Sequence, residues 1–103
     1  MRTALIVDDS AVIRSVARRI LETLNFEVSA AEDGEQALAM CKDAMPDVIL
    51  LDWNMPNMDG YAVLRALRGS YEGLKPKVLF CTAENDVGAI ARALRGGADE
   101  YIM

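Results

Sequence analysis

The sequence predicts an α/β fold in which helices cover both faces of one parallel sheet. Short apolar runs, rich in Val, Ile, Leu and Phe, alternate along the chain with segments whose apolar residues recur at helical spacing. Strict alternation of strands and helices implies parallel strands that are joined by right-handed crossovers. The 103 residues, of which 52% are hydrophobic and 26% charged, suit a single domain with its own core. We therefore expect residues 1–103 to form one doubly wound domain.

The first third of the chain is expected to form a strand, a helix and a second strand. Residues 4–7 are a continuous apolar run, too short for a helix, which is typical of a strand buried on both faces. Residues 26–30 alternate apolar with polar side chains, which predicts a strand at the edge of the sheet. Between them, helical spacing places one set of side chains on a single apolar face. This set is Ile13, Val16, Ala17, Ile20, Leu21 and Leu24.

The middle of the chain repeats this alternation. Apolar residues between 37 and 45 mark a second helix, which Asp33 or Gly34 could begin. Residues 48–51 form a third apolar run and a third strand. Apolar residues between 63 and 67 mark a third helix, entered at Asp59-Gly60.

The last third completes the sheet. A glycine- and proline-containing loop over residues 69–76 precedes a fourth strand at 78–81. A fourth helix is expected over residues 87–94, and a fifth strand over 101–103. The edge character of the second strand favours a flavodoxin-like order, 2-1-3-4-5, over a barrel. In such sheets, ligands bind beyond the carboxyl ends of the strands, near strands 1 and 3.

Charge and residue usage exclude several classes of function. The net charge of −5 argues against direct binding of nucleic acid or of an anionic membrane, and no apolar run is long enough to span a bilayer. Two cysteines, Cys41 and Cys81, are too few for a disulfide framework, so we expect a reduced, cytoplasmic protein. The absence of histidine excludes a Ser-His-Asp triad and a histidine-ligated zinc site.

Acidic residues follow two of the predicted strands at the edge where ligands are expected. Asp8 and Asp9 follow the first strand and Asp52 the third, while Thr82 follows the fourth. Three crowded carboxylates repel one another, and a hard divalent cation relieves that repulsion. Oxygen ligands without His or Cys favour Mg²⁺, or Mn²⁺, which commonly binds phosphate oxygens as well. A carboxylate can itself accept a phosphoryl group as an acyl phosphate, to which Thr82 would donate a hydrogen bond.

Each of these residues also has a simpler interpretation. Asp8-Asp9-Ser10 could cap the helix that follows, Asp52 could be a turn residue, and Thr82 could simply end a strand. Their coincidence on three adjacent strand ends favours a functional site. Arg14 and Arg18 lie one turn apart in the first helix, where we expect a solvated face, with docking of a kinase as the alternative.

Taken in order, these motifs resemble the receiver domain of two-component response regulators, most closely the single-domain chemotaxis-type form. The resemblance runs from Leu5 to Met103 and is specific because all the pieces occur together at matching spacings. The pieces are Ile6-Val7-Asp8-Asp9-Ser10, Asp33-Gly34, residues 46–52 (Pro-Asp-Val-Ile-Leu-Leu-Asp), residues 55–60 (Met-Pro-Asn-Met-Asp-Gly), Thr82-Ala83 and residues 97–101 (Gly-Ala-Asp-Glu-Tyr).

The resemblance implies a phosphorylation-controlled signalling switch and not an enzyme. Asp52 would accept a phosphoryl group from a histidine kinase or a histidine phosphotransfer protein. Asp8 and Asp9 match the acidic pair that holds Mg²⁺, with Asp52 and the backbone carbonyl of Asn54 completing the metal ligands. Thr82 matches the switch hydroxyl and Tyr101 the aromatic switch residue. Output would pass to a downstream protein target through protein contacts.

Two other functions compete with this interpretation. An aspartyl-phosphate phosphohydrolase of the haloacid dehalogenase type also uses an Asp at the end of a parallel strand. That chemistry requires a second acid two residues further on, where this chain has Asn54. A pseudo-receiver would act only as a binding module, and the intact acidic set argues against it.

The resemblance also implies a Lys-Pro pair and a final helix after the fifth strand. The sequence ends at Met103, so we expect a receiver domain that is incomplete at its C-terminus. Either such a tail belongs to the natural protein, or a dimer or another partner covers the sheet face that the helix would cover.

Overall fold

The computed structural model describes residues 2–52, 55, 58–69, 76–81 and 100–102. Within these ranges, strands and helices alternate nearly as the sequence predicts. The predicted strand bounds differ from the observed ones by one residue or not at all. The predicted fourth helix at 87–94 and most of the predicted loop at 69–76 lie outside the described residues. The elements are β1 Thr3–Val7, α1 Ala11–Thr23, β2 Glu27–Ala31, α2 Gly34–Asp43, β3 Val48–Leu51, α3 Gly60–Arg68, β4 Lys77–Cys81 and β5 Glu100–Ile102.

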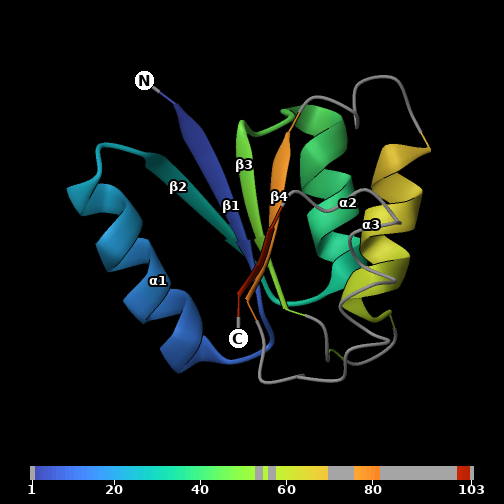
Figure 1. Ribbon diagram of the computed structural model, residues 1–103, viewed down its shortest axis with the longest axis horizontal. Coiled ribbons are helices and arrows are strands. Elements are labelled where there is room, and N and C mark those ends of the chain that lie inside the picture. The colour runs from blue at the N-terminus through green and yellow to red at the C-terminus, as the bar shows by residue number, and fades with distance from the viewer. Residues whose placement is uncertain (1, 53–54, 56–57, 70–75, 82–99, 103) are drawn as a thin grey trace.

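All five strands of the described residues pair in parallel in the order β2-β1-β3-β4-β5. Helix α1 covers one face of the sheet, and α2 and α3 cover the other (Figure 1). The doubly wound, flavodoxin-like prediction is confirmed, including the edge position of the second strand. Val7 lies opposite both Ala31 and Leu51, so β1, β2 and β3 end at the same level. The residues that follow these strands therefore meet at one edge.

Alternation along the central strands divides the core between the two faces. Leu5, Val7, Ile49 and Leu51 pack beneath α2 and α3 in the larger cluster of buried side chains. Ala4 and Ile6 point to the other face, where Leu21 of α1 covers them.

Local sequence determines where each described helix begins. Ser10, Asp33 and Asp59 are the N-cap residues of α1, α2 and α3. Each side chain accepts a hydrogen bond from the backbone N–H three residues later, and the two aspartate caps have distances of 2.8 Å. The predicted starts at Asp33 and Asp59 agree with these caps.

The predicted apolar face of α1 is only partly buried. Leu21 is buried and Ala17 is half-buried, whereas Ile20 and Leu24 are 56% and 61% exposed. All the large hydrophobic side chains that are exposed in the described part of the chain belong to α1 or its C-cap. They are Val12, Ile13, Val16, Ile20 and Leu24. Among the described strands and helices, α1 makes its close contacts with β1 and β2.

Candidate functional site

Three carboxylates converge at the carboxyl edge of the sheet. One oxygen from each of Asp8, Asp9 and Asp52 lies within 4.8 Å of the other two. The parallel pairing of β1 with β3 produces this convergence. The pairing continues one residue past β3, because the N–H of Asp52 donates to the carbonyl of Val7 at 2.9 Å. Residues 43 positions apart in the chain therefore share one site.

Asp8 is the buried member of this acidic cluster (Asp8, Asp9 and Asp52). Its side chain is only 8% exposed. Its N–H donates to the carbonyl of Ala31 at 3.2 Å, and its Oδ1 accepts from the N–H of Ser10 at 2.8 Å. Its carbonyl accepts from Nη1 of Arg14, also at 2.8 Å. Asp9 is exposed and Asp52 is half-buried, so the cluster opens to solvent on one side.

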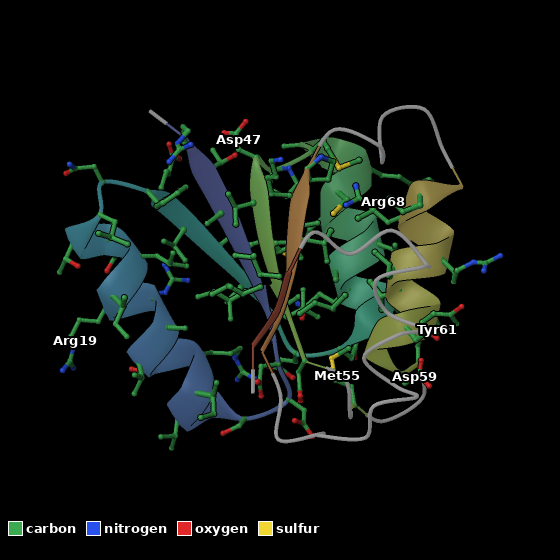
Figure 2. The ribbon with its side chains drawn as sticks, viewed as in Figure 1. Arg19, Asp47, Met55, Asp59, Tyr61 and Arg68 are labelled. Atoms are coloured by element: carbon green, nitrogen blue, oxygen red, sulfur yellow. The ribbon has the colours of Figure 1, made fainter. Side chains whose placement is uncertain are left out.

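The arginines of α1 correct one expectation from the sequence. Arg14 and Arg18 do not form a solvated face, because both are half-buried and donate to backbone carbonyls. Arg14 binds the carbonyl of Asp8, and Arg18 binds the carbonyl of Val28 in β2 at 3.0 Å. Arg19 is the exposed arginine of this helix and points away from the sheet (Figure 2). Sequence spacing places a residue on a helix face, but the strand ends that the face approaches are set by tertiary packing.

The chemistry of the cluster suits a divalent cation. Its donors are carboxylate oxygens, which Mg²⁺ and Mn²⁺ prefer, and the chain contains no histidine that would favour zinc. Helix capping does not account for the cluster. The cap of α1 is the Ser10 hydroxyl, whereas Asp8 and Asp9 lie beside Asp52.

The other predicted site residues are described only in part or not at all. Asn54 and Thr82 lie outside the described residues. Tyr101 is a residue of β5, and its backbone is paired with that of Phe80 in β4. The structure therefore brings together Asp8, Asp9 and Asp52 of the predicted set.

Gly34 has a structural role near this edge. The sequence predicted it only as a possible start of the second helix. A Cβ atom on Gly34 would lie 2.6 Å from Cγ2 of Val63 and 3.1 Å from the sulfur of Met58. The missing side chain lets α2 begin directly against α3 and the segment that precedes it. The Asp-Gly pair was the available signal, because Asp33 caps the helix and Gly34 permits the close approach.

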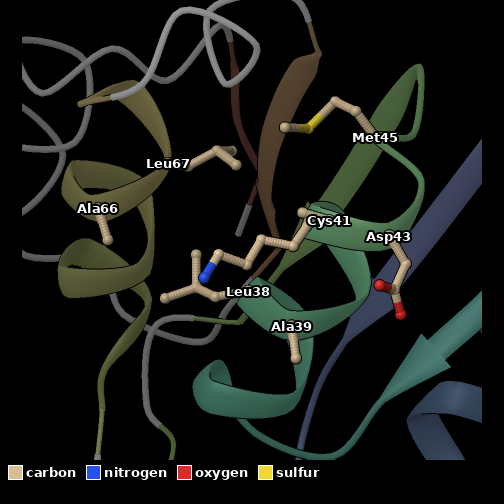
Figure 3. A pocket seen from close by; sticks show the side chains of 8 residues that line it. Leu38, Ala39, Cys41, Asp43, Met45, Ala66 and Leu67 are labelled. Carbon is tan, nitrogen blue, oxygen red and sulfur yellow. The ribbon is translucent and has the colours of Figure 1, made fainter.

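A separate cavity of about 880 Å³ lies between α2 and α3 (Figure 3). Its lining includes Leu38, Cys41, Met45 and Leu67. Cys41 is buried, and burial raises the pKa of its thiol because the thiolate would lose its hydration. The cavity lies along the C-terminal half of α2, and the acidic cluster lies near the other end of that helix.

None of the helices in the described ranges combines the length and the apolarity that crossing a membrane requires.

Comparisons with known proteins agree on one family. A family model described as the response regulator receiver domain matches residues 4–103. The chain is 38% identical over 99 residues to the probable transcriptional regulator ycf27 of Guillardia theta, covering 96% of this chain and 38% of that protein. It is 37% identical over 101 residues to the phosphate regulon transcriptional regulatory protein PhoB of Pseudomonas aeruginosa, covering 98% and 44%. The chain thus spans about two fifths of the length of these curated relatives.

Solved structures give the same result. The chemotaxis protein CheY4 of Vibrio cholerae matches with a TM-score of 0.94 at 33% identity, covering 100% of this chain and 86% of that one. The signal receiver domain of a histidine kinase from Syntrophus aciditrophicus matches with a TM-score of 0.90 at 32% identity, covering 99% and 77%.

Proposed function

This chain belongs to the response regulator receiver domain family, and from that premise we propose that it is a signalling switch controlled by phosphorylation of Asp52. Receiver domains act in two-component phosphorelays, in which histidine kinases supply the phosphoryl group, and they are switches rather than classical enzymes. The observation that carries the proposal is the convergence of Asp8, Asp9 and Asp52 within 4.8 Å at the carboxyl edge of the sheet.

The proposed chemistry is transfer of a phosphoryl group between side chains. A carboxylate oxygen of Asp52 attacks the phosphorus of a phosphohistidine on a kinase or a phosphotransfer protein. The new O–P bond forms as the P–N bond breaks, and the departing imidazole keeps the electron pair and takes up a proton. Asp52 is half-buried, which leaves it open to a donor from outside. These 103 residues contain no histidine, so the donor comes from elsewhere.

The donor set fits Mg²⁺, with Mn²⁺ as the alternative ion. We propose Asp9 as a direct ligand because it is exposed, and Asp8 as a residue that acts mainly through water because its Oδ1 is already bonded to Ser10 N–H. Asp52 and the backbone carbonyl of Asn54 complete the proposed ligands. When bound, the ion would offset the negative charge of the carboxylates and of the phosphoryl group.

Thr82 and Tyr101 complete the proposed switch. The Thr82 hydroxyl would donate to a phosphoryl oxygen, and Tyr101 would respond to the movement of Thr82. Both assignments rest on the family resemblance at these two positions. We further propose a cytoplasmic location and an output to a downstream protein, through contacts of the receiver surface and without direct binding of nucleic acid.

The exposed apolar side chains of α1 support a further expectation about assembly. Val12, Ile13, Val16, Ile20 and Leu24 together present an apolar surface to solvent, which favours covering by other polypeptide. We propose that this face is covered either by a further segment of the natural protein or by a partner, including a second copy in a dimer.

Titration of Mg²⁺ followed by beryllofluoride tests the proposed function. The single tryptophan, Trp53, directly follows Asp52 in sequence, so its fluorescence is expected to report both additions. The parent should respond to Mg²⁺ and then to beryllofluoride, whereas Asp52→Asn should lose the second response. A parent that does not respond to Mg²⁺ would refute the metal site and favour a binding module. Multiple turnovers of a free phosphate ester would instead indicate a phosphohydrolase.

A further inference from the structure

Arg14 contacts the acidic cluster through the protein backbone. It lies in the first turns of α1, is half-buried, and donates from Nη1 to the carbonyl oxygen of Asp8 at 2.8 Å. That oxygen belongs to the peptide group joining Asp8 to Asp9. Because a peptide group is planar, a hydrogen bond to its oxygen restrains the orientation of the whole plane, from one Cα atom to the next. The hydrogen bond from Arg14 therefore influences the directions in which the carboxylates of Asp8 and Asp9 point.

The turn at Asp8 is held at three points. Its N–H is bonded to Ala31 of β2, its carboxylate to the N–H of Ser10, and its carbonyl to Arg14. The first two bonds come from the sheet and from the turn itself. Only the third depends on a long side chain, and a guanidinium donor makes it a strong, charge-assisted hydrogen bond.

Arg14 acts on a bound cation in two opposing ways. Its positive charge repels the ion, so removing that charge alone would tighten Mg²⁺ binding. Its hydrogen bond holds the turn in place, so removing that bond would weaken Mg²⁺ binding, as happens when outer partners of metal ligands are lost. Arg14 is half-buried, so solvent and salt screen part of its charge, whereas they do not replace its hydrogen bond to the Asp8 carbonyl.

We propose that Arg14 is a positioning residue for the divalent-cation site: it holds the Asp8–Asp9 peptide in the orientation that lets the acidic cluster bind the ion. This inference rests on the proposed function and deepens it, because it concerns the same site. Helix α1 thereby serves as more than a covering for the sheet, since its first turns help to arrange the ligands.

The arginines of α1 provide matched variants for the test. Arg14→Gln removes the bond to Asp8, and Arg18→Gln removes an equivalent bond to the carbonyl of Val28, on the edge strand β2. Arg19→Gln removes the same charge from the exposed face of the helix. Arg14→Lys keeps the charge and a donor but lacks the planar fork of the guanidinium.

Two quantities are measured for each variant: the Mg²⁺ dissociation constant, from Trp53 fluorescence at constant ionic strength, and the urea midpoint without metal. We expect Arg14→Gln to weaken Mg²⁺ binding about 10-fold, and Arg14→Lys to recover part of that loss. Arg18→Gln should lower the urea midpoint, yet leave Mg²⁺ affinity within about twofold of the parent, because its bond is not at the site. Arg19→Gln should change neither. All measurements are made in sucrose, which favours the folded state of a weakened variant.

The direction of the change decides the outcome. Unchanged or tighter Mg²⁺ binding by Arg14→Gln would overturn the inference, as would an equal weakening by Arg18→Gln, which would indicate a general effect of loosening α1. If the parent itself binds no Mg²⁺, the proposed function fails and this inference fails with it. If the parent binds Mg²⁺ and Arg14→Gln binds it equally well, only the inference fails.

Discussion

Replacing Asp52 by Asn should stabilise the metal-free protein. Asp52 contributes to two of the three carboxylate pairs in the acidic cluster, where one oxygen from each residue lies within 4.8 Å of the others. Without a cation these charges repel in the folded state and lie farther apart in the unfolded chain. The amide of Asn is nearly the same size as the carboxylate but carries no charge, so the substitution removes both repulsions.

The separation sets the magnitude. At 4.8 Å, the upper limit of these oxygen–oxygen distances, two unit charges repel by about 1 kcal/mol in a water-like medium and by about 3 kcal/mol at an effective dielectric constant near 20. Because Asp9 is exposed and Asp52 half-buried, the lower value applies more closely, so we expect a net gain of about 1–2 kcal/mol at low salt. At about 1 M NaCl the Debye length falls to about 3 Å, and the gain should fall by half or more.

Urea denaturation followed by circular dichroism, with a chelator and at two salt concentrations, measures this gain. Glu27→Gln is the matched control, because Glu27 is exposed and is the first residue of β2. It is paired with Thr3, at the end of the sheet where the strands begin and not where the acidic cluster lies. Glu27→Gln should change stability by less than about 0.5 kcal/mol. Addition of Mg²⁺ should stabilise the parent more than Asp52→Asn. If Asp52→Asn is no more stable than the parent at low salt, or if its gain is independent of salt, the electrostatic account of the cluster is refuted.

Two further predictions concern the packing of α2. Gly34→Ala should destabilise the protein by about 1–3 kcal/mol because its Cβ would lie 2.6 Å from Val63. Gly69→Ala, whose Cβ would lie 3.4 Å from the carbonyl oxygen of Ala66 at a φ of −72°, should be tolerated, and equal urea midpoints for the two variants would contradict this reasoning. Burial raises the pKa of the Cys41 thiol from its ordinary value of 9.0, so the folded state binds this proton more tightly than the unfolded state. The resulting stability is present below about pH 9 and is lost as the pH rises above it. Urea midpoints from pH 7 to 10 should therefore fall more steeply for the parent than for Cys41→Ala, and parallel profiles would exclude a contribution from Cys41.

The fold was predictable from the sequence because its signals are local. The run at residues 48–51 is apolar throughout and became β3 with the same bounds, Val48–Leu51. The alternation at 26–30 indicated an edge strand, and β2 lies at the edge. Asp33 and Asp59 mark helix starts because an aspartate cap satisfies N–H groups only three residues away.

The acidic cluster was predictable for a different reason. Parallel strands of a doubly wound sheet all end at one edge, so residues that directly follow neighbouring strands must approach one another. Predicting the convergence of Asp8, Asp9 and Asp52 required only the strand order and the strand ends, and both were predicted from the sequence. Their close approach in the structure follows from the register of β1 with β3.

Side-chain contacts between residues that are distant in sequence could be seen only in the tertiary structure. Arg14 and Arg18 follow the pattern of a solvated face, yet each reaches a carbonyl that becomes available only when α1 lies against the sheet. The close approach at Gly34 likewise depends on where α3 packs. The sequence by itself determined the described strands and helices, their order and the acidic edge, because periodicity, caps and strand ends are local properties. The tertiary structure decided which side chains hold that edge in place and which apolar residues of α1 stay exposed, because both depend on how separate elements pack.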